Sequence, residues 1–172
     1  MSIGGLGLSS APPRTNVARD LTVMRVRAEQ IVKSGAGWFI WIAALSLINS
    51  LVTIFNGNFH FILGLGVTEI VDAFAHGAGP AAAIPGLIIN LFVGGVFVLF
   101  WQFGRKGQTW AFIVGMVLYG LDGVLLLLFR DILSVAFHAY ALFMLYRGLT
   151  GISMLRKCEQ AELLSAVAIQ PN

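Results

Sequence analysis

Residues 84–129 read IPGLIINLFVGGVFVLFWQFGRKGQTWAFIVGMVLYGLDGVLLLLF. Two apolar runs, 84–103 and 109–129, stand on either side of the short polar segment GRKGQ. About 20 apolar residues in a helix are enough to cross the hydrocarbon core of a bilayer. This stretch therefore predicts two membrane-spanning helices that a tight turn joins into an antiparallel hairpin.

Two further runs, 37–56 and 132–151, have the same length and character. The chain of 172 residues is 58% hydrophobic and 11% charged, with a mean hydropathy of +0.85, whereas about 25% of residues are charged in ordinary soluble proteins. A chain of this length has room for one bundle and no separate soluble domain. We therefore predict an all-α integral membrane protein built as a four-helix bundle.

Segment 59–80 is apolar enough for a fifth span, but it contains Glu69, Asp72 and His76. With four spans and a cytoplasmic N-terminus, only Arg130 of the 11 Lys and Arg residues falls outside, whereas five spans would leave five of them outside. Because loops rich in Lys and Arg stay in the cytoplasm, four spans are favoured. The segment then lies outside as an interfacial or re-entrant helix that caps the outer mouth of the bundle.

The tryptophans agree with this topology, because indole rings favour the headgroup region. Trp38, Trp41, Trp101 and Trp110 all fall at the inner boundary of the predicted spans. We expect a multi-pass protein of the cell inner (plasma) membrane with both termini in the cytoplasm.

Residues 1–35 are predicted to form a cytoplasmic tail and an amphipathic helix. Apolar residues recur every three or four positions from Val17 to Val32, which is the helical period. The opposite face carries Arg19, Arg25 and Arg27. We expect this helix to lie on the inner leaflet, where basic residues meet anionic lipid; the alternative is a docking helix for a partner protein. The transmembrane bundle then covers 36–151, and 152–172 is a second cytoplasmic tail.

Polar residues inside the spans share one depth. Asp122 lies eight residues before Arg130 and His138 seven after Asp131, so both lie roughly 11 to 12 Å below the outer turn. The same counting around the inner turn, and from the end of the first span, brings three more residues to this level. The predicted polar intramembrane cluster comprises Asn49, Ser50, Asn90, Asp122 and His138.

An ionisable residue at this depth should face the bundle interior and find a partner, and His138 is the obvious partner for Asp122. In one interpretation the cluster forms hydrogen bonds that fix helix register. In a second it handles a proton or cation, because a carboxylate beside an imidazole can change charge near neutral pH. In a third, His138 or His76 is an axial ligand to a tetrapyrrole.

Glu69, Asp72 and His76 are spaced i, i+3 and i+7, which places them on one stripe of a helix. This outer capping stripe could supply oxygen and nitrogen ligands to a divalent metal. Acidic stripes are common on solvated helix faces, so the spacing alone does not predict a metal site.

Other functional classes find little support in the sequence. The glycine pairs lack the strand-to-helix context of a phosphate-binding loop. The net charge of +3 is explained by topology, so we expect no nucleic-acid partner. We do not expect an enzyme, and the sequence assigns no cofactor.

We therefore expect a small polytopic membrane protein that acts as a non-catalytic accessory or structural subunit of a larger membrane complex. Its partners would be membrane lipid and either other membrane subunits or further copies of the chain. The alternative is a proton- or cation-coupled transporter or channel for a small solute that uses Asp122 and His138. The third function is a membrane subunit that binds haem or chlorophyll through a histidine.

Overall fold

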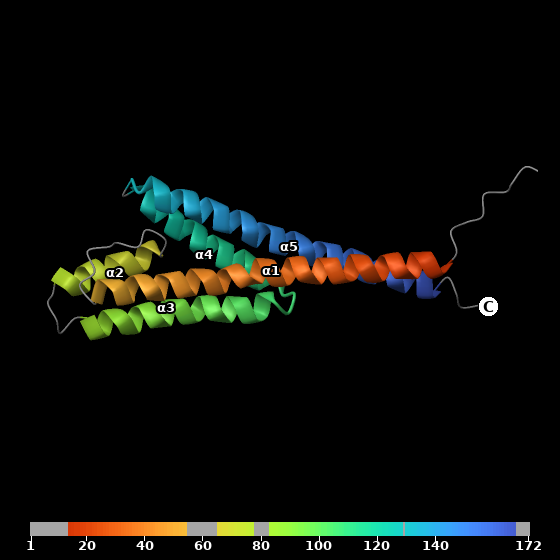
Figure 1. Ribbon diagram of the computed structural model, residues 1–172, viewed down its shortest axis with the longest axis horizontal. Coiled ribbons are helices and arrows are strands. Elements are labelled where there is room, and N and C mark those ends of the chain that lie inside the picture. Colours follow the sequence, from red (N-terminus) through yellow and green to blue (C-terminus); the bar gives the residue numbers. More distant parts are fainter. Residues whose placement is uncertain (1–13, 55–64, 78–82, 129, 168–172) are drawn as a thin grey trace, which may run out of the picture.

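The computed structural model describes residues 14–54, 65–77, 83–128 and 130–167 (Figure 1). Every element in these ranges is a helix, which confirms the all-α class. The elements are α1 (Arg14–Ile54), α2 (Gly66–Gly77), α3 (Ala83–Gly104), α4 (Thr109–Leu128) and α5 (Ile132–Val167). Of these, α1, α3, α4 and α5 are long and apolar enough to cross a membrane.

Helices α1 and α5 are longer than the sequence predicts, at 41 and 36 residues. One helix runs through both the predicted amphipathic segment and the first predicted span, with no break near residue 36. No proline lies within α1, and a glycine inside a helix costs only about 1 kcal/mol. The packing of the buried Gly35 against α5 offsets that cost. The predicted tail after residue 151 likewise begins as a continuation of α5.

Of the described helices, α1 and α5 alone continue beyond the α3–α4 turn, side by side and antiparallel (Figure 1). Gly104, the last residue of α3, lies beside Ala36 of α1. We call residues 14–35 of α1 and 152–167 of α5 the stalk. At 1.5 Å per residue, the α1 part of the stalk is about 33 Å long.

Arg25, Val32 and Gly35 of α1 contact α5 at spacings of seven and three, as in a coiled coil. Arg25 forms an exposed ion pair with Glu162 at 3.3 Å, which puts these two residues at one level of the stalk. Val32 and Gly35 are buried.

The two helices approach most closely where the stalk joins the bundle. A Cβ atom placed on Gly35 would lie 2.3 Å from the Cα atom of Gly148, and one on Gly151 would lie 2.9 Å from a side-chain carbon of Val32. Small residues that let two backbones meet are typical of helix interfaces in membranes. Glycines on separate helices therefore set the contact between α1 and α5.

Next to the α3–α4 turn, an aromatic core fills the bundle. Phe39 of α1 lies 5.7 Å from both Phe100 and Phe112, measured between ring centroids, and Phe97 lies 6.1 Å from Tyr119. All five side chains are buried. The buried polar residues of the described chain lie beyond this core, towards the α4–α5 turn.

Asp131 caps the start of α5. The backbone N–H of Ser134 donates to its carboxylate at 3.2 Å, and the Ser134 hydroxyl donates to its other oxygen. Loss of such a cap costs about 1 kcal/mol. We expect Asp131→Ala to lower the free energy of unfolding by about that amount in a detergent unfolding titration. Asp131→Asn keeps a capping oxygen and should lose less than half as much; equal losses for the two variants would contradict the cap.

Candidate functional site

Asp122 of α4 is the centre of a buried polar layer. Its side chain is only 5% exposed, and its carboxyl group takes part in three hydrogen bonds. The backbone N–H of Gly66 donates to Oδ2 at 2.8 Å and that of Val67 to Oδ1 at 2.9 Å, while Nε2 of His138 lies 2.9 Å from Oδ2. The two backbone donors come from the start of α2, and the imidazole comes from α5.

The two backbone donors belong to the first turn of α2. The first N–H groups of a helix have no acceptor within the helix and carry a partial positive charge. Asp122 supplies that acceptor from a neighbouring helix, and its negative charge suits this end of α2. Helix α2 therefore begins at the level of Asp122 and lies beside α1 and α3 (Figure 1). Of the two predicted arrangements, interfacial or re-entrant, a helix that starts inside the bundle agrees with the re-entrant one.

His138 shares one proton with Asp122. Its Nδ1 lies 2.8 Å from the backbone carbonyl of Ser134, and a carbonyl only accepts hydrogen bonds, so Nδ1 carries a hydrogen. One further proton then joins Nε2 and the Asp122 carboxylate. On whichever atom it resides, the pair as a unit is neutral.

The ring of Tyr119 stacks on His138, with centroids 4.2 Å apart and planes 13° apart. Both side chains are at most 2% exposed. Gly123 makes room for the imidazole, because a Cβ atom there would lie 3.2 Å from the Cβ of His138. His138 is therefore held by packing against Tyr119 and Gly123 as well as by its hydrogen bonds.

A second set of hydrogen bonds joins α1, α2 and α3. The Ser46 hydroxyl donates to Thr68 at 3.0 Å, since the Thr68 hydroxyl itself donates to the carbonyl of Leu65. The Asn90 amide donates to the Ser50 hydroxyl at 2.7 Å. The first turn of α2 thus connects to α1 through Thr68 and to α4 through its backbone.

The structure buries all five residues of the predicted cluster, Asn49, Ser50, Asn90, Asp122 and His138. Within this cluster, Asn90 bonds to Ser50 and His138 bonds to Asp122. The first turn of α2 links the two pairs, because its backbone N–H groups donate to Asp122 and Thr68 bonds to Ser46 of α1. Sequence reasoning missed Gly66, Val67 and Thr68; the requirement of a helix start for an acceptor is the signal that could have found them.

The outer capping stripe falls in α2, but the side chains of Glu69, Asp72 and His76 lie outside the described part of the structure. A metal site there stays a prediction. At His138, both ring nitrogens already have partners, so binding to a haem iron would require breaking the contact with Asp122 or Ser134. The geometry does not favour the tetrapyrrole interpretation at this residue.

Comparisons with known protein families, curated proteins and solved structures found no match. The fold and the polar layer define the class: an all-helical protein with four helices long and apolar enough to span a membrane. A short additional helix is anchored among them by a buried carboxylate.

Proposed function

We propose that this chain is a non-catalytic subunit of a larger assembly in the inner (plasma) membrane, and that the stalk binds its partner. The observation that carries the proposal is the exposure of large apolar side chains along the stalk. Seven large apolar side chains there are each at least 46% exposed, and the Arg25–Glu162 ion pair puts those of α1 and α5 at one level. They are Val17, Val23, Met24, Val26, Leu163, Leu164 and Val167.

The charges of the stalk support its projection into water. Arg19, Arg27 and Lys33 on α1 and Lys157 and Glu159 on α5 are all exposed. Each such charge costs about 2.5 to 3.5 kcal/mol in the middle of a bilayer. Exposed apolar clusters on a surface in water are typical of protein-binding sites. This combination favours a docking element over a segment buried in lipid.

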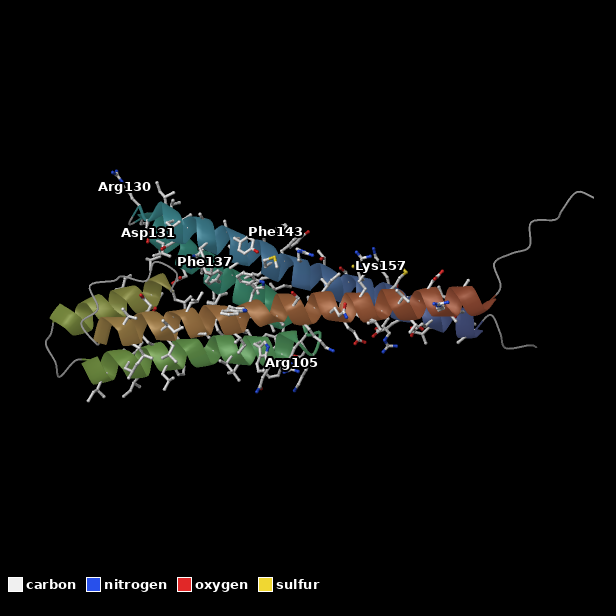
Figure 2. All side chains as sticks on the ribbon, in the orientation of Figure 1. Arg105, Arg130, Asp131, Phe137, Phe143 and Lys157 are labelled. Carbon is white, nitrogen blue, oxygen red and sulfur yellow. The ribbon has the colours of Figure 1, made fainter. Side chains whose placement is uncertain are left out.

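The basic residues also support the direction of insertion. Figure 2 shows Arg105 at the stalk end of the bundle and Lys157 on the stalk itself, whereas Arg130 lies at the opposite end. Lys and Arg concentrate on the cytoplasmic side of membrane proteins. We therefore place the stalk and both termini in the cytoplasm and the α4–α5 turn outside, with α2 as a re-entrant helix that starts at mid-bundle.

The polar layer supports a structural role within this subunit. Its hydrogen bonds connect α1, α2, α3, α4 and α5, so they fix the mutual register of the helices. Between this layer and the α3–α4 turn lies the aromatic core around Phe39 and Phe112. A solute that crossed the bundle would have to displace these buried rings.

The proposal is tested by placing two charges on the apolar surface of the stalk. In Val23→Glu with Leu164→Glu, we expect affinity for the partner to fall at least about tenfold, because central apolar contacts dominate binding at interfaces. The measurement is native mass spectrometry of the full chain purified from its own membranes in mild detergent. The wild type should retain stoichiometric subunits, either other proteins or further copies of the chain.

The matched control is Gln30→Glu with Ser165→Glu, which adds the same charge at exposed polar positions of the stalk. It should retain its partners. A wild-type chain that leaves the membrane as a single polypeptide, or a control that dissociates as readily as the test variant, would contradict the docking role.

A second candidate function is a proton- or cation-coupled transporter, favoured by the buried proton that Asp122 and His138 share. Under this function, Asp122→Asn abolishes solute uptake while the protein remains folded. If the chain is a non-catalytic subunit, the same substitution weakens folding, and neither the wild type nor the variant takes up solute. Uptake into vesicles that contain the purified chain separates the two.

A further inference from the structure

A groove between α2, α3 and α4 lies next to the polar layer. Its volume is about 440 Å³, which is in the range of small-molecule sites. Among the residues that line it are Val67, Phe92, Val96, Leu118 and Leu121, and Asp122 is the one polar member of the described lining. The groove is thus almost entirely apolar, with Asp122 on its wall.

The groove opens sideways, on the lateral surface of the bundle. Phe92 and Leu121 at its edges are 72% and 62% exposed. In the membrane placement proposed above, on which this inference rests, that flank faces hydrocarbon. Only a molecule dissolved in the bilayer would reach the groove, and most of that molecule must be apolar.

The hydrogen bonds of Asp122 define the polar end of the ligand. Each carboxylate oxygen has two acceptor positions. On Oδ2 both are used, by Gly66 and His138, whereas Oδ1 receives only the N–H of Val67 from the described residues. Oδ1 can therefore accept one further hydrogen bond.

The charge of the pair decides which donor fits best. Asp122, His138 and their shared proton are neutral together, so a cationic ligand would carry an unbalanced charge into apolar surroundings. A hydroxyl group donates one hydrogen bond and brings no charge. We propose that the groove binds a long-chain alcohol, with its alkyl chain along Phe92, Val96 and Leu121 and its hydroxyl donating to Oδ1 of Asp122.

The test uses the full chain in lipid nanodiscs and hexadecanol with a photoreactive diazirine on its alkyl chain. Labelled residues are located by mass spectrometry. We expect the label on the parts of α3 and α4 that line the groove. Unlabelled 1-hexadecanol should compete about tenfold better than hexadecyl methyl ether, because the ether cannot donate a hydrogen bond to Oδ1 of Asp122.

A substitution that fills the groove gives an independent readout. Leu121→Trp should reduce labelling about tenfold. Its control, Leu127→Trp, changes an exposed leucine of the same helix that is not part of the lining, and should leave labelling unchanged.

Two outcomes would overturn the inference. One is equal competition by the alcohol and the ether; the other is labelling of α5 as strong as that of the groove, which would indicate ordinary lipid contact. Carbonate extraction of the same membranes separates this failure from failure of the proposed function. A chain that is released by carbonate contradicts the membrane subunit itself, whereas a chain that stays embedded but does not select the alcohol contradicts only the groove.

Discussion

Replacement of Asp122 by alanine is expected to lower the free energy of unfolding by about 3 to 5 kcal/mol, the range for breaking a buried charged pair. The substitution removes the acceptor of the Gly66 and Val67 N–H groups and the partner of His138 at once. The first turn of α2 would then lose its contact with α4. The measurement is reversible unfolding of the full chain in mixed micelles, with Asp122→Ala compared with the wild type.

Asp122→Asn is the matched control because it preserves the size of the side chain. Its carbonyl oxygen can accept from Val67 and its amide can donate to Nε2 of His138, but the amide nitrogen then faces the N–H of Gly66. One unsatisfied buried donor costs about 1 to 3 kcal/mol, so this variant should be intermediate. An alanine variant within 1 kcal/mol of the wild type would show that Asp122 does not hold α2.

Substitution of Gly35 is expected to have the second large effect. In Gly35→Ala the new Cβ would lie 2.3 Å from the Cα of Gly148, and a backbone atom cannot rotate away. Helices α1 and α5 must separate, and overpacking of this kind costs about 1 to 3 kcal/mol. Gly35→Val should cost more. The same micelle unfolding measurement detects both losses.

Gly37 provides the control two residues along the same helix. A Cβ atom there would meet nothing within 4 Å. Gly37→Ala should therefore be neutral or stabilise the chain by up to about 1 kcal/mol, through helix propensity alone. If Gly35→Ala and Gly37→Ala had equal effects, the close contact of α1 with α5 would be contradicted.

The sequence predicts the two central helices well for a clear physical reason. The apolar runs 84–103 and 109–129 agree to within one residue with α3 and α4. Their ends coincide with the polar turn GRKGQ and with Arg130, where the chain changes direction. Gly107 and Arg130 adopt the positive φ angles, 77° and 60°, that these tight turns require. Hydropathy and turn composition report the same boundaries.

The extent of α1 and α5 could not be predicted in this way. Hydropathy falls where the stalk begins, so a prediction based on the length of each apolar run ends the helix there. The stalk is held by the pairing of α1 with α5, through the contact of Val32 with Gly151 and the ion pair of Arg25 with Glu162. These partners are more than 100 residues apart in sequence, and no local pattern pairs them.

Residue counting brings Asp122 and His138 to one depth, and the structure places them 2.9 Å apart. Counting gives depth but not the rotation of each helix, so it could not separate this pair from Ser50 and Asn90. It also missed the first turn of α2. Gly66 and Val67 contribute through backbone N–H groups, which an inspection of side-chain types does not detect.

The most direct test of the membrane subunit is the labelling of single cysteines by a membrane-impermeant maleimide on intact cells. In a Cys158→Ser background, cysteine is placed in turn at Val23 on the stalk, Lys106 in the α3–α4 turn and Arg130 in the α4–α5 turn. We predict labelling from outside at position 130, and at positions 23 and 106 only after the cells are opened. Labelling of positions 106 and 130 from the same side of the membrane would contradict the four-span arrangement and, with it, the cytoplasmic stalk.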